Sequence, residues 1–168
     1  FDQGLMACLE AGLSPDFTDE TGEESILAQA ARNTRNNIVS LLLSKGAEAN
    51  KLSVHGRSAV LEAALANNVE GINLLFQAGC DLNIEDSAQF TPLLNAITEG
   101  ATLSCIRLIE LGADTNLSFS FSSLGDLARA MGHDECAMAV ETAIATKCAE
   151  QLQETTYSAA RTATRRNL

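Results

Sequence analysis

Histidine and cysteine are among the residue types in this 168-residue sequence that could serve as general bases, nucleophiles or metal ligands. His55 has no carboxylate, cysteine or second histidine at ligand spacing, and neither His55 nor His133 comes with the nucleophile and oxyanion donors of a catalytic site. The sequence also lacks a phosphate-binding loop, a G-x-S-x-G elbow and an H-E-x-x-H helix. We therefore predict that the chain is not an enzyme.

The cysteines are odd in number and dispersed, without the C-x-x-C pairs of zinc or redox sites. They are Cys8, Cys80, Cys105, Cys136 and Cys148. Cys8 and Cys105 stand where similar segments carry Leu, Ile or Val, and Cys80 stands in place of an alanine, so we interpret them as small buried apolar side chains. Acidic clusters such as Glu85-Asp86 lack the alternating oxygens and central glycine of a calcium loop. We expect no cofactor and no metal site.

The elements that would position these side chains recur every 33 residues. A turn phrase occurs as Gly46-Ala47-Glu48-Ala49-Asn50, Gly79-Cys80-Asp81-Leu82-Asn83 and Gly112-Ala113-Asp114-Thr115-Asn116. A Ser/Thr-led phrase precedes each helix pair as Ser25-Ile26-Leu27, Ser58-Ala59-Val60, Thr91-Pro92-Leu93 and, less regularly, Ser123-Leu124-Gly125. Between the phrases, apolar residues spaced i, i+3 and i+4 predict a helix with one buried stripe.

Residue types at the helix ends agree with this periodicity. Ser25, Ser58 and Thr91 are suited to cap helix N-termini, because their hydroxyls accept hydrogen bonds from free amides. The turn-phrase glycines are suited to end the second helix of each unit, where a positive φ is commonly required. Asn67, Gly100 and Gly132 lie between paired helices, where a left-handed backbone is also expected.

The two phrases together resemble the ankyrin repeat family, whose 33-residue unit contains T-P-L-H-x-A and G-A-D-x-N. The resemblance covers roughly residues 4–144, and only Thr91-Pro92-Leu93 matches the first phrase fully. Ala28, Leu61 and Leu94 stand where the family's first phrase has histidine. His133 belongs to a Gly-His turn that resembles the turn between the two helices of an ankyrin repeat, which implies a structural role. The resemblance implies an all-α solenoid of helix-turn-helix units with β-hairpin-like loops.

We expect a single ankyrin-repeat domain over 1–168. Its segments are a half repeat or N-cap at 1–16, full repeats at 17–50, 51–83 and 84–116, a degenerate repeat at 117–144, and a C-terminal helical extension at 145–168. A helix running from Cys136 past Leu152 would cap the stack, because a solenoid must end in a polar outer face. A dimerising helix is the alternative, although its apolar stripe fades after Leu152.

Charge narrows the class of partner. The chain carries −11 overall; Arg161, Arg165 and Arg166 against Glu154 leave the last 18 residues at +2 and hence the first 150 at −13. We predict no nucleic acid partner and no membrane partner, since an acidic body repels phosphate and no apolar run is long enough to span a bilayer. Dispersed thiols favour the cytoplasm, and secretion or a periplasmic location stays open if a signal was removed.

The resemblance also implies where a partner would bind. Ankyrin-like proteins contact partners mainly just before the Thr-Pro-Leu phrase and seven or eight residues after its Thr. Carried onto this chain, the predicted contact residues are Arg32, Asn33, His55, Arg57, Leu65, Phe90, Glu99, Phe119 and Met131. Aromatic side chains, Met and Arg are enriched at interface centres. Packing of Phe90 back into the fold is the alternative, and Arg32 and Arg57 are expected to meet carboxylates on the partner.

These observations predict a protein-binding module whose concave face docks another folded protein and which is a monomer when free. One hypothesis is a stand-alone inhibitor or immunity-type regulator that covers an enzyme's active site. The alternative is an adaptor or scaffold module from a larger multidomain protein.

Overall fold

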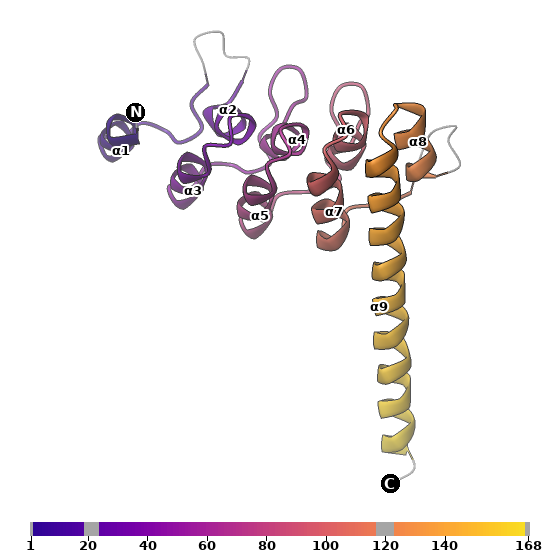
Figure 1. Cartoon of the computed structure of the whole chain (residues 1–168). Coiled ribbons are helices and arrows are strands. Elements are labelled where there is room, and N and C mark those ends of the chain that lie inside the picture. The colour runs from indigo at the N-terminus through magenta and orange to yellow at the C-terminus, as the bar shows by residue number, and fades with distance from the viewer. Residues whose placement is uncertain (1, 19–23, 117–122, 167–168) are drawn as a thin grey trace.

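The structure is a computed structural model that describes residues 2–18, 24–116 and 123–166. The helices in these ranges are α1 (Asp2–Glu10), α2 (Ile26–Arg32), α3 (Asn36–Ser44), α4 (Ala59–Leu65), α5 (Val69–Gln77), α6 (Pro92–Thr98), α7 (Thr102–Leu111), α8 (Leu124–Ala130) and α9 (Asp134–Arg166). From α2 onward they form pairs, and Figure 1 shows the pairs stacked side by side, with the loops before α4 and α6 along one edge. The predicted all-α solenoid is confirmed.

Each helix packs against its counterpart in the next pair, so the core runs along the stack. The first helices α2, α4, α6 and α8 contact one another in order, and so do the second helices α3, α5, α7 and α9. Alanines such as Ala31, Ala63 and Ala96 are fully buried and let the first helices approach closely. Leu42 and Leu75 fill the layer between first and second helices without solvent exposure.

The predicted helix caps are present. Ser25 Oγ accepts from the Ala28 amide at 3.2 Å, and Thr91 Oγ1 accepts from the Leu94 amide at 3.3 Å. Ser58 and Ser123 cap α4 and α8 in the same way. Gly112 ends α7 with φ of 105°, in the left-handed region that favours glycine. These local signals fix where the helices begin and end.

Equivalent hydrogen bonds join each turn phrase to the next one. In each bond a side-chain oxygen accepts from a backbone amide of the next unit. The bonds are from the Glu48 amide to Asp16 Oδ1 (2.8 Å), from the Asp81 amide to Asn50 Oδ1 (2.7 Å) and from the Asp114 amide to Asn83 Oδ1 (2.8 Å). Because the same bond recurs at the same place, successive units keep the same offset.

The stack ends at α9, whose first part packs against α7 and α8. Lys147 Nζ donates to the carbonyl of Ile109 at 2.5 Å and so adds a second donor to an acceptor near the end of α7 that already bonds to the Gly112 amide. The described side chains from Cys148 onward are exposed, and Figure 1 shows this part of the helix projecting beyond the repeats. The helix runs without interruption across the expected boundary between residues 144 and 145.

Glu141 of α9 stands at the position that the buried Ile109 occupies on α7, and an ion pair explains the charged residue there. Both its oxygens accept from Arg129 at 2.8 Å, and its side chain lies across Gly125, which has no Cβ to obstruct it. The hydrogen bonds from Arg129 hold the pKa of Glu141 below its usual range. A salt bridge on the outer face thus replaces a hydrophobic contact at the end of the solenoid.

The prediction of buried cysteines is right for Cys80 and Cys105 and wrong for Cys8. Cys80, Cys105 and Cys136 are buried, and the Cys105 and Cys136 sulfurs lie 3.7 Å apart between α7 and α9. Cys8 is exposed, because α1 packs through Leu5 and Leu9 and turns Cys8 outward.

Candidate protein-binding surface

The described loops 51–57 and 84–90, which precede α4 and α6, form hairpin-like fingers, which we call the second and third fingers after their repeats. In the second finger (residues 51–57), the Ser53 amide donates to the Arg57 carbonyl at 2.9 Å; in the third (residues 84–90), Asp86 N donates to Phe90 O at 3.1 Å. Ser87 Oγ donates to the His55 carbonyl at 2.9 Å and so ties the two fingers together. The second and third fingers therefore lie side by side on one edge of the stack (Figure 1).

The described candidate residues lie on this edge or at the ends of the first helices. We call them, with Leu52 and Val54, the finger face; its predicted members are Arg32, Asn33, His55, Arg57, Leu65, Phe90, Glu99 and Met131. Arg32, Leu65, Glu99 and Met131 occupy the last turn or C-cap of α2, α4, α6 and α8, so they recur once per unit. Phe119 lies outside the described residues.

The apolar candidates differ in how far they reach solvent. Met131 is 48% exposed, whereas Leu65 is half-buried. Phe90 is half-buried and packs against the hydrophobic core, as the alternative interpretation expected. Phe90 thus serves the packing of its own repeat, and only part of its ring surface is open to a partner.

Two exposed aliphatic residues of the second finger were not among the predicted contact residues. Leu52 is 46% exposed and Val54 is 70% exposed, and Val54 precedes the exposed His55. Their signal in the sequence was two aliphatic residues, one apart, in a short loop of otherwise polar residues. Isolated exposed apolar side chains are common, but two of them within three residues of one finger add apolar surface that a partner can cover.

A buried carboxylate organises the charges of the finger face. Glu62, on α4, is fully buried and accepts a hydrogen bond from Arg57 Nε. Arg32 lies 3.8 Å from the other oxygen of Glu62 and forms a 2.7 Å pair with Glu24. Both arginines are therefore already paired with carboxylates of this chain, although they had been expected to be available for carboxylates on a partner.

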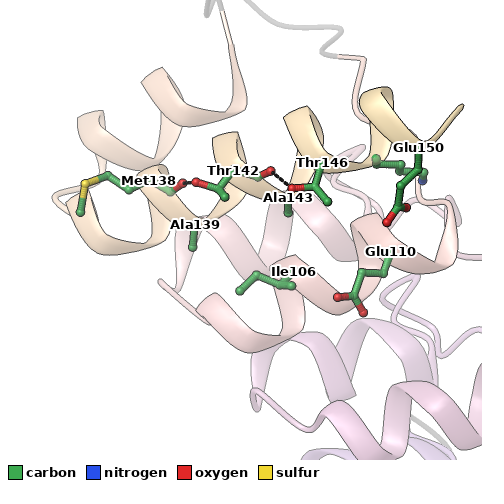
Figure 2. Close-up of a pocket in the computed structure, with 9 residues that line it drawn as sticks. Ile106, Glu110, Met138, Ala139, Thr142, Ala143, Thr146 and Glu150 are labelled. Atoms are coloured by element: carbon green, nitrogen blue, oxygen red, sulfur yellow. Dashed lines mark hydrogen bonds between the residues drawn. The ribbon is translucent and has the colours of Figure 1, made fainter. Parts of the chain in front are cut away.

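A hollow of about 480 Å³ lies on the other side of the stack, between α7 and α9. Figure 2 shows Ile106 and Glu110 of α7 facing Met138, Ala139 and Ala143 of α9, with Glu150 at one end. Both glutamates lie at the end of the hollow away from Met138, and Thr142, Thr146 and Lys147 are the other polar residues of the lining. Over the residues that the structure describes, no group of three or more His, Cys, Asp or Glu could hold a metal ion. No helix of this part of the chain has the length and apolarity needed to cross a bilayer.

Comparisons with known proteins agree with the repeat architecture. A family model described as "Ankyrin repeats (3 copies)" matches residues 4–86 and 27–119. The chain is 31% identical over 115 residues to E3 ubiquitin-protein ligase KEG of Arabidopsis thaliana, covering 68% of this chain and 6% of that protein. It is 29% identical over 106 residues to SH3 and multiple ankyrin repeat domains protein 2 of Homo sapiens, covering 62% of this chain and 6% of that protein. Protein phosphatase 1 regulatory subunit 27 of Homo sapiens is 41% identical over 59 residues, 35% of this chain and 38% of that protein. The chain thus spans about 6% of the length of the first two relatives.

Proposed function

Because this chain belongs to the ankyrin repeat family, whose repeats are protein–protein interaction modules, we propose that it binds a folded protein partner through the finger face. The observation that carries the proposal is the exposure of Val54 and Leu52 on a finger that is hydrogen-bonded to its neighbour. Burying such side chains against a partner removes apolar surface from water, at about 25 cal/mol per Å².

The finger face is suited to binding because it is already ordered. The second and third fingers are closed by backbone hydrogen bonds and joined through Ser87 and His55. Met131 lies at the end of α8, on the same row of helix ends as Arg32. Since few side chains need to be ordered on docking, more of the interaction free energy remains as affinity.

Two modes of action fit this surface. As an inhibitor or immunity-type regulator, the chain would cover the active site of an enzyme; the likeness to a phosphatase regulatory subunit supports this mode. As an adaptor, it would recruit a partner for other domains, and the likeness to short segments of much longer proteins supports this alternative. Its dispersed thiols fit a reducing compartment, so we place either mode in the cytoplasm.

Site-specific photo-crosslinking tests the proposed surface. A photoreactive phenylalanine analogue replaces Val54 in one variant and Met131 in another, and each is irradiated in an extract of the source cells. Leu103 is the matched control, because it is 59% exposed on α7, on the second-helix side. We expect one protein to crosslink from positions 54 and 131 but not from 103. Crosslinking only from position 103 would contradict the proposal and move the binding surface to the second helices.

A further inference from the structure

We propose that the partner docks a basic segment on the finger face, with a lysine or arginine side chain pairing with Glu24 beside Arg32. This inference rests on the proposed function and adds the chemistry of the partner. It reverses the expectation from the sequence that Arg32 and Arg57 await carboxylates.

The first observation is a row of four charged side chains, one of which has an oxygen without a hydrogen-bond donor. Glu24, Arg32, Glu62 and Arg57 alternate in sign across the first and second repeats. Glu62 is fully buried, yet within the described residues its Oε2 has no hydrogen-bond partner. A buried carboxylate oxygen without a donor is destabilising, so a rearrangement that supplies one is favourable.

Arg32 is the side chain that can supply this donor. Its Nη2 is engaged by Glu24 at 2.7 Å, while its Nη1 stays 3.8 Å from Glu62 Oε2. A movement of about 1 Å would bring that nitrogen within hydrogen-bond distance of Glu62. A cation from the partner that pairs with Glu24 would release Arg32 to make this move. Binding would then complete the buried pair as well as add a new one.

The second observation is the sign of the surrounding charge. The four members of the row sum to zero, so the two arginines offer no net positive charge to an acidic partner. Residues 1–31 contain seven Asp or Glu and no Lys or Arg, and the first 150 residues carry −13. On the same face Glu99 is exposed at the end of α6. This field attracts a basic segment and repels an acidic one.

Two synthetic peptides serve as probes for the intact chain. One carries lysines separated by Gly-Ser spacers, and the other is identical except that glutamate replaces each lysine. Binding is measured by fluorescence anisotropy at low and at physiological salt. The Nε–H signals of Arg32 and Arg57 are followed by NMR in the same titrations. We expect the lysine peptide to bind and to shift the Arg32 signal, and the glutamate peptide to do neither.

Matched charge variants separate local docking from general attraction. Glu24→Gln removes the proposed docking carboxylate. Glu70→Gln, an exposed position on α5, makes the same change in net charge on the second-helix side. We expect Glu24→Gln to weaken the lysine peptide roughly tenfold, equivalent to about 1.4 kcal/mol, and Glu70→Gln to weaken it less than twofold. Thermal unfolding of both variants verifies that they remain folded.

Three results would overturn the inference: no binding of the lysine peptide, tighter binding of the glutamate peptide, or equal weakening by both variants. Its failure can be told apart from failure of the proposed function. If a protein crosslinks from position 54 and Glu24→Gln leaves that capture unchanged, protein binding stands and cationic docking at Glu24 does not.

Discussion

Glu62 is the side chain whose substitution tells most about the charges of this chain. Its counterparts one repeat away on either side are Gln29 and Asn95, which are polar and uncharged. The side chain of Asn95 donates to Asp86, in the finger of its own repeat, at 3.2 Å. Glu62 makes the same kind of contact with Arg57, but as a buried ion whose stability depends on its partner.

Arg57→Met should destabilise the fold, because it leaves Glu62 charged and buried without its donor. We expect the free energy of unfolding to fall by about 2–3 kcal/mol, below the full range for buried pairs since Arg57 is half exposed. Urea unfolding measures it, with Lys45→Met as the exposed control. The double variant Arg57→Met with Glu62→Gln should regain most of the loss. A loss of equal size in the double variant would show that packing of the arginine, and not charge, was responsible.

Cys80 predicts a pH dependence of stability. Burial, with a contribution from the charge of Asp81, raises the pKa of the Cys80 thiol from 9.0 to about 11. The unfolded thiol ionises first as pH rises, so this stabilisation is fully present below about pH 9 and is lost toward pH 11. Cys80→Ala should flatten this decline, and Ala47 and Ala113 already occupy the equivalent position in neighbouring repeats. Urea unfolding in reductant at about pH 8 and about pH 10 compares the two proteins. Parallel declines would contradict the assignment.

Asn68 shows how one element depends on another far away in the sequence. Its side-chain oxygen caps α5 by accepting from the Gly71 backbone amide at 2.9 Å. Its side-chain nitrogen donates to the Ala31 carbonyl at 2.9 Å and to Asn36 Oδ1 at 2.9 Å. A Cβ on Gly71 would come within 2.4 Å of the Asn68 amide nitrogen. Glycine at position 71 leaves room for the Asn68 side chain, which in turn bonds to the preceding repeat.

Gly71→Ala should therefore destabilise the fold by about 1–2 kcal/mol, even though alanine is the better helix former by up to about 1 kcal/mol. Gly4→Ala, in α1, is the matched control because a Cβ there meets nothing within 4 Å, and it should gain up to about 1 kcal/mol. Thermal unfolding of both variants gives the comparison. A gain in both would mean that the Asn68 side chain finds another arrangement at no cost.

How far the sequence predicts an element depends on whether its signal is local. Ser25 and Thr91 were recognised as caps because a hydroxyl and the amides it caps lie within three residues. The direction of Phe90, the outward turn of Cys8 and the burial of Glu62 depend on neighbouring helices, which the sequence does not place to within a side chain. The resemblance to the ankyrin repeat family implied the contact residues at the helix ends and on the fingers, but the exposure of Leu52 and Val54 emerged only from the packed loops.

At the scale of the molecule, α9 divides into a part that belongs to the stack and a part that projects from it. Removing residues 151–168 should leave the unfolding midpoint within about 2 °C, because the described side chains from 151 to 153 are exposed. Removing residues 142–168 also deletes Ile144, which packs on the core, and the bond from Lys147 to Ile109. That truncation should lower the midpoint by roughly 5 °C or more. Equal midpoints would show that the stack does not need α9 beyond residue 141.

The projecting part of α9 places the end of the helix at a set distance from the repeats. Helix nucleation is already achieved where α9 is anchored on α7 and α8, so extending it into solvent needs only propagation. From Cys148 to Arg166 the helix spans about 27 Å at 1.5 Å per residue. Figure 1 shows this arm leading away from the edge that carries the fingers. A protein segment joined to the end of this arm would consequently be held away from a partner bound to the finger face. The two could then be attached to the chain at the same time without contact.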